Sequence, residues 1–265
     1  MTRPLHLVRM PIDAGRLYAF ARRSRLAARD FDDGYAVHAL LAALFDHGSS
    51  DGARLAPKPF AIDSSIPDPA RRGQSARSLD VLGYCTLDHR ALAERARAFA
   101  DPLAWGVCDL DAMGSRPMPE AFAPGTRLGF TLRACCVRRV AKRGNQRADR
   151  AEVDAFLAKA WEAGDRSVEL EREQVYRGWL EQEIAKESAS KLLRASMVSW
   201  RLARLHRRSQ GAERRGSRVQ HPDVTFDGVL EVVDPSAFAT RLARGVGRHR
   251  SFGFGMLLLK PPTRG

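Results

Sequence analysis

Tyr35 and His38 lie three residues apart, and their side chains suit proton-transfer chemistry. On a helix they would fall on adjacent turns, about sixty degrees apart around the axis. A neutral imidazole can take a proton from a ribose hydroxyl, a charged imidazole can give one to a leaving oxygen, and a phenol can position a phosphate or assist. Taken alone, the spacing is more typical of a half-buried aromatic beside a surface histidine, so the surrounding elements must support any catalytic interpretation.

A helix over about residues 33–46 is expected to carry this pair, with Val37, Leu40, Leu41 and Leu44 as its apolar stripe. The other elements of the N-terminal half are predicted as a strand at 5–12, an Arg-rich stretch, a strand at 81–87 and an Asp-capped helix at 88–100. Residues 101–124 contain Pro and Gly without clear periodicity, and this indicates a linker or insertion.

A second unit is expected to begin at Gly125. Its predicted elements are strands at 127–134, 191–205, 224–233 and 256–260, a basic loop after the first strand, and helices at about 149–162, 169–187 and 234–244. Each half therefore mixes strands and helices in a β-α-β manner. This predicts an α+β fold of two tandem ferredoxin-like (RRM-like) domains, residues 1–120 and 121–265, although the length also allows a single α/β domain.

Charge points to a polyanionic partner. The 265 residues include 44 Lys+Arg against 31 Asp+Glu, a formal net charge of +13, which suits nucleic acid or an anionic membrane. Arginine supplies most of the positive charge, and its guanidinium binds phosphate in a bidentate manner, which favours nucleic acid. The alternatives are a merely solvated basic surface and the arginine bias of a G+C-rich genome. The sequence has no apolar run of membrane-spanning length and no signal core, so we expect a soluble, cytoplasmic protein without a membrane partner.

The positive charge is concentrated in the windows 133–147, 191–218 and 245–250, whereas 169–187 is net acidic. Such segregation is typical of a binding face. The glycines of 245–255 let the backbone approach a phosphate, but no strand precedes them and no helix follows, which disfavours a dinucleotide site. The residues expected to contact nucleic acid are Arg23, Arg133, Arg138, Arg139, Lys142, Arg143, Arg204, Arg207, Arg208, Arg248 and Arg250.

The four cysteines, Cys85, Cys108, Cys135 and Cys136, contain no CxxC pair, and two of them are adjacent. This spacing disfavours a structural zinc site and a disulfide framework. We assign no metal ligands and no cofactor from the sequence.

The motifs together resemble a known family. Gly-Tyr-x-x-His at 34–38, Phe-Thr-Leu-Arg-Ala at 130–134, Phe-Asp-Gly-Val-Leu-Glu-Val at 226–232 and the Gly-rich segment 245–259 follow one another in the order seen in the CasE branch of the CRISPR RNA-processing endoribonucleases. The set spans nearly the whole chain, and its order is more specific than any one motif.

The resemblance implies two RRM-like domains and metal-independent cleavage of precursor CRISPR RNA within the repeat, near the base of its hairpin. Attack by the 2′-hydroxyl would leave a 2′,3′-cyclic phosphate. By position, Tyr35 and His38 match the family's catalytic pair. The implied partners are the CRISPR repeat RNA, the mature crRNA on which the enzyme stays, and the other subunits of a multisubunit effector complex.

Three departures from the family pattern leave alternatives open. They are the Arg-rich stretch before the Tyr/His helix, the Cys135–Cys136 pair and the strongly basic 201–218. Either Tyr35 or an arginine could assist His38, and the host system could be type I-E or a relative such as type IV. A non-catalytic subunit that only binds the RNA hairpin is the main alternative; a DNA-binding regulator is disfavoured because helix-turn-helix spacing is not evident.

Overall fold

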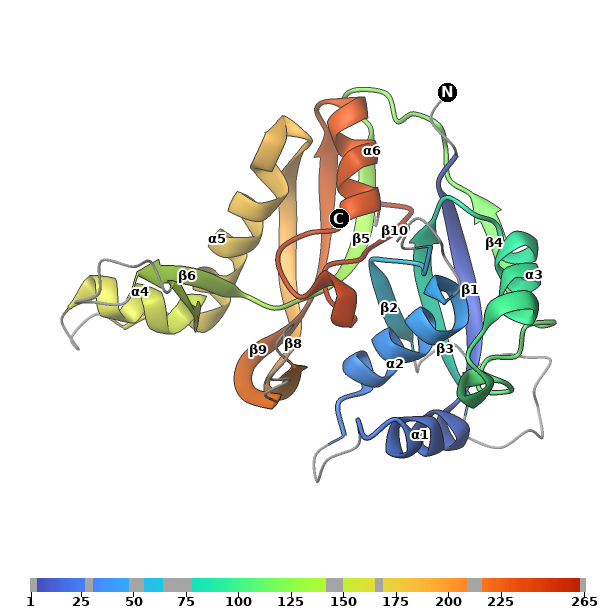
Figure 1. Cartoon of the computed structure of the whole chain (residues 1–265). Coiled ribbons are helices and arrows are strands. Elements are labelled where there is room, and N and C mark those ends of the chain that lie inside the picture. The colour runs from blue at the N-terminus through green and yellow to red at the C-terminus, as the bar shows by residue number, and fades with distance from the viewer. Residues whose placement is uncertain are drawn as a thin grey trace. The chain divides into compact units, whose positions relative to one another are not determined.

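The computed structural model describes residues 4–26, 31–47, 55–63, 78–141, 150–164, 169–208 and 216–262. The chain forms two compact units (Figure 1). Unit 1 comprises Met1–Glu120 and Arg250–Met256, and unit 2 comprises Ala121–His249 and Leu257–Gly265. Among the helices in the described ranges, none is both long and apolar enough to cross a membrane.

Unit 1 is a four-stranded antiparallel sheet with helices between its strands. Its elements are β1 (His6–Asp13), α1 (Ala14–Arg23), α2 (Asp33–Leu41) with a π-helical extension η1 (Ala42–Asp46), β2 (Phe60–Asp63), β3 (Ser78–Cys85), α3 (His89–Phe99), a 3-10 turn η3 (Pro102–Ala104) and β4 (Gly114–Pro117). The strand order is β2-β3-β1-β4. This is the order of a β-α-β-β-α-β ferredoxin-like unit.

Local sequence explains the helices of unit 1. Asp13, Asp32 and Asp88 are the N-caps of α1, α2 and α3, and each carboxylate accepts a backbone N–H from the first turn. In α1, Leu17, Phe20 and Ala21 are buried, at the spacing of one helical face. The same core includes alternate residues of β1, so sheet and helices bury their apolar faces against each other.

Unit 2 repeats this topology with an inserted hairpin. Its elements are β5 (Arg127–Ala134), β6 (Val137–Ala141), β7 (Arg150–Asp154), α4 (Ala155–Ala163), α5 (Arg172–Ala185), a 3-10 turn η4 (Lys186–Ser188), β8 (Ser190–Arg208), β9 (Gly216–Val232), α6 (Pro235–Arg244) and β10 (Leu257–Lys260). The main sheet has the order β10-β5-β9-β8, and β6 pairs only with β7 among the described strands. Figure 1 shows this hairpin and α4 extending beside α5.

The centre of the unit 2 sheet depends on one glycine. Phe130 of β5 lies opposite Gly228 of β9. A Cβ at Gly228 would come within 2.6 Å of the Phe130 ring, so the aromatic side chain occupies the space that any larger residue would need. Phe130 and Phe226 are both fully buried, and they anchor the two central strands to the core.

The α+β class and the ferredoxin-like units agree with the sequence prediction, but three local predictions were wrong. The Arg-rich stretch after β1, for which no element was predicted, forms the helix α1. The expected linker 101–124 contains η3 and the edge strand β4. The basic loop after β5 begins as β6, and the helix predicted from residue 149 starts only at α4, after β7. Strand β4 has only four residues and little apolar character, and the adjacent Arg138 and Arg139 interrupt the apolar alternation of β6, so neither strand has a periodicity that predicts it.

Candidate functional site

Helix α2 holds the proposed catalytic pair. Asp32 accepts the backbone N–H of Tyr35 at 2.9 Å and fixes the start of the helix. Val37, Leu40 and Leu41 are fully buried, whereas Tyr35 and His38 are only partly buried. The rings of Tyr35 and His38 lie 6.4 Å apart between centroids, so the phenol and the imidazole share one side of the helix.

A third ring completes this cluster. Phe252 belongs to the 3-10 turn η5 (Arg250–Phe252), which is part of unit 1. Its ring stacks on Tyr35 at 5.9 Å and lies tilted against His38 at 4.8 Å, both measured between centroids. These contacts restrict the rotamers of both candidate side chains, which is what a proton-transfer site needs in order to hold its groups in place.

Gly34 makes the approach of this turn possible. A Cβ at Gly34 would lie 2.2 Å from the backbone oxygen of Phe252. The glycine of the Gly-Tyr-x-x-His motif is therefore required by close backbone packing, and not by an unusual backbone angle of its own.

Two of the predicted RNA-binding arginines belong to the same unit. Arg250 is the first residue of η5 and is partly buried, and Arg23 is exposed in the last turn of α1. Unit 1 thus combines Tyr35 and His38 with one arginine in the turn that packs on them, and it places the other arginine on a neighbouring helix. The sequence alone did not point to Phe252, because it lies over 200 positions from Tyr35 and His38 and no sequence spacing connects it with them.

The remaining predicted arginines of unit 2 differ in their surroundings. Arg139 on β6 and Arg204 on β8 are exposed. Arg138 is also exposed, and it donates to Glu162 at 2.8 Å. Lys142 and Arg143 lie outside the described residues, as do the side chains of Arg207 and Arg208, whose backbones end strand β8.

Arg133 takes part in a structural ion pair. Its Nε and Nη2 atoms donate to the two carboxylate oxygens of Asp223 at 2.7 and 2.9 Å, and Arg201 donates to the same carboxylate at 2.9 Å. Burial alone would raise the pKa of Asp223, but hydrogen bonds and charge from Arg133 and Arg201 outweigh it, so the pKa lies below its ordinary value. The three residues join β5, β9 and β8 across the sheet.

Arg248 also has an acidic partner, Glu152 of β7. The same carboxylate accepts from His249 at 2.8 Å and lies 3.7 Å from His221 of β9. The hydrogen bond from His249 is the main reason that the pKa of Glu152 falls to about 2, with further lowering by Arg248. This cluster was not predicted from the sequence, because its members come from three separate elements.

Comparisons with known proteins agree with the fold. The model of a family described as "CRISPR associated protein" matches residues 5–261. The CRISPR-associated endoribonuclease Cse3 of Thermus thermophilus is 32% identical over 163 residues, which cover 59% of this chain and 68% of the relative.

Two solved structures share the fold over nearly the whole chain. Thermus thermophilus Cse3 bound to an RNA representing a pre-cleavage complex has a TM-score of 0.58 at 20% identity, and covers 97% of this chain and 100% of the other. Cas6e from Escherichia coli K-12 has a TM-score of 0.53 at 17% identity, with coverages of 97% and 100%.

Proposed function

Since the chain belongs to the CRISPR-associated protein family, we propose that it is a metal-independent endoribonuclease that cleaves precursor CRISPR RNA within the repeat, near the base of its hairpin. The observation that carries this proposal is the 32% identity to a relative named as a CRISPR-associated endoribonuclease. The Tyr35–His38–Phe252 cluster supports it, because it offers a proton-transfer group held by packing.

The proposed reaction is a transesterification. The 2′-oxygen attacks the adjacent phosphorus, the bond from phosphorus to the 5′-oxygen breaks, and a 2′,3′-cyclic phosphate and a 5′-hydroxyl result. One proton leaves the 2′-hydroxyl and one reaches the 5′-oxygen, so the step needs no outside reactant. His38 is the main group for these transfers, and Tyr35 positions the phosphate or assists. An arginine could replace that assistance by stabilising the charge of the phosphorane.

The basic residues bind the hairpin. A-form RNA exposes phosphates and its shallow groove rather than major-groove base edges, so recognition depends on stem shape and charge. Arg139 and Arg204 have exposed side chains and suit direct phosphate contact. Arg133, Arg138 and Arg248 already bind acidic partners, so RNA phosphates would share or displace those pairs.

We also propose that the protein stays on the mature crRNA as a subunit of a multisubunit effector complex. A chain of a structure described as a CRISPR RNA-guided surveillance complex shares this fold, with a TM-score of 0.53 at 18% identity, and this likeness concerns the fold alone. The net charge of +13 supports retention of an RNA product.

The test is cleavage of the cognate repeat RNA in EDTA, with His38→Ala as the variant and His47→Ala as the control. His47 is also a histidine of unit 1, but it is exposed and lies beyond the end of α2. We expect wild type and His47→Ala to yield a cyclic phosphate in EDTA, and His38→Ala to bind the RNA but cleave it at least about a hundredfold more slowly.

A 3′-hydroxyl product or an absolute need for added metal would contradict the mechanism. Unchanged cleavage by His38→Ala would remove this histidine from the reaction. If the wild-type protein binds the hairpin tightly but never cleaves it, the protein is a non-catalytic hairpin-binding subunit instead.

A further inference from the structure

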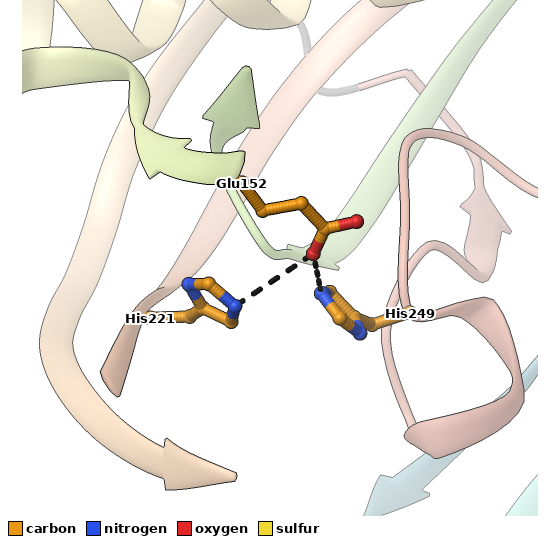
Figure 2. A group of neighbouring side chains, drawn as sticks. All are labelled: Glu152, His221 and His249. Atoms are coloured by element: carbon orange, nitrogen blue, oxygen red, sulfur yellow. Dashed lines mark hydrogen bonds and ion pairs between the residues drawn. The ribbon is translucent and has the colours of Figure 1, made fainter. Parts of the chain in front are cut away.

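Glu152, His221 and His249 form a compact group in unit 2 that the proposed reaction does not use. Figure 2 shows the carboxylate of Glu152 pointing between the two imidazoles. Oε2 of Glu152 lies 2.8 Å from Nε2 of His249 and 3.7 Å from Nε2 of His221. Each residue offers one ligand atom, and these atoms all lie within 4.8 Å of one another.

We propose that this group is a zinc-binding site. Two imidazole nitrogens and one carboxylate oxygen are a donor set that Zn²⁺ uses, with a fourth position left for water. Ligand atoms about 2.1 Å from a tetrahedral Zn²⁺ lie about 3.4 Å from one another. The two separations from the Glu152 oxygen, 2.8 and 3.7 Å, bracket that value. The ligand nitrogens of the two histidines lie within 4.8 Å of each other, so binding would require them to approach by at most about 1.4 Å.

The surroundings hold the three side chains in place. His221 is buried, with its side chain 6% exposed, and Glu152 and His249 are 21% and 11% exposed. The two imidazole rings lie 5.2 Å apart between centroids. A site that is largely shielded from water and positioned before the ion arrives loses less entropy when it binds.

Arg248 is the principal competitor for Glu152. Arg248 binds Oε1 of Glu152, whereas both histidines lie close to the other oxygen, Oε2. Such a partner orients a metal-bound carboxylate from outside, but its positive charge also repels a cation. The expected selectivity is therefore for an ion that gains from nitrogen ligands, such as Zn²⁺, over Mg²⁺, which prefers oxygen ligands and retains its water.

The ion would have a structural role. Its ligands come from β7, β9 and the Gly-rich loop after α6, which are separated by many residues in the sequence. His249 has a φ of 58°, a left-handed conformation that is uncommon for a residue with a side chain and needs support from its surroundings. Zinc coordination would fasten this loop, with Arg248 beside it, to two strands of the same unit.

The experiment measures Zn²⁺ binding by the full chain without RNA, by competition with a chromophoric chelator after all metal has been removed. We expect one Zn²⁺ per chain, an increase of Tm with Zn²⁺ but not with Mg²⁺, and affinities at least about tenfold weaker in Glu152→Gln and His249→Gln. His47→Gln is the matched control, since it removes an exposed histidine of unit 1, and it should bind like wild type.

Equal affinities in wild type and in both variants would overturn the proposal, as would the absence of binding in wild type. The variants leave buried His221 unchanged, and His249 lies in a loop, so His249→Gln remains informative if the substitution of Glu152 in strand β7 prevents folding. His38→Ala should bind Zn²⁺ like wild type, and this result separates the zinc site from the cleavage reaction.

Discussion

Replacing Asp223 with asparagine tests how far the ion pairs of unit 2 stabilise its sheet. The Asp223 side chain is only 6% exposed, and it accepts two hydrogen bonds from Arg133 and one from Arg201. Asparagine has nearly the same shape but lacks the charge, and it can accept through only one of its two terminal atoms. The substitution therefore removes the pairing without opening a large cavity.

The magnitude follows from the exposure of the partners. Arg133 is 28% exposed, and hydrogen bonds between charged groups in such a place contribute about 1.5–3 kcal/mol. Arg201 is 72% exposed, so its bond adds about 0–1 kcal/mol. The neutral side chain costs less to bury, and this offsets part of the loss. We expect Asp223→Asn to lower the free energy of unfolding by about 2–3 kcal/mol.

Urea unfolding followed by tryptophan fluorescence measures this change, because Trp161, Trp179 and Trp200, three of the four tryptophans, belong to unit 2. Asp111→Asn is the matched control. Asp111 also pairs with an arginine, Arg97, but its side chain is 90% exposed, so we expect no measurable change. A loss below about 0.5 kcal/mol in Asp223→Asn, or an equal loss in the control, would refute the reasoning.

Two further predictions concern packing and pH. Gly34→Ala should lower the free energy of unfolding by about 1–3 kcal/mol in thermal unfolding, because the new Cβ meets the Phe252 backbone. The control Gly178→Ala has open space around it in α5 and should raise the free energy of unfolding by up to about 1 kcal/mol. No change in Gly34→Ala would contradict the close contact between Gly34 and Phe252. Burial alone would raise the pKa of Asp227, but the hydrogen bonds from Thr131 and Lys260 have the larger combined effect, so the pKa lies below its ordinary value. Since the pKa of Asp227 in the folded protein is below the unfolded value of about 4, the charged carboxylate stabilises the fold above that pH, and this stabilisation is lost as the pH falls. Asp227→Asn should therefore reduce the loss of the free energy of urea unfolding on acidification. An unchanged loss would contradict a stabilising role for the charged Asp227.

Much of the fold could be predicted because its helices carry strong local signals. Asp88 and Asp234 cap α3 and α6, Pro235 occupies the first turn of α6, and the observed helices start where these residues predict. Strands β4 and β6 have no comparable signal, because their place depends on pairing with another strand rather than on their own apolar pattern.

The candidate site could be predicted only where its residues are neighbours in the sequence. Helical spacing predicts that Tyr35 and His38 lie close together, although their proposed role rests on the family resemblance, whereas the ring of Phe252 reaches them only through tertiary packing. Charge clusters show where arginines are concentrated but not which acid each one meets. Arg133 lies opposite Thr225 in the strand register, which brings it next to Asp223, 90 positions along the chain.

The assignment of 250–256 to unit 1 has a consequence for the timing of synthesis. These residues leave the ribosome about 130 residues after Glu120, a delay of roughly 6–26 s at a translation rate of about 5–20 residues per second. Until then α2 lacks the turn that packs on Tyr35 and His38, while the first sheet of the nascent chain already has all of its strands. A ribosome-bound fragment would thus fold early yet hold this pair loosely, and any activity that needs the completed cluster would begin only late in translation.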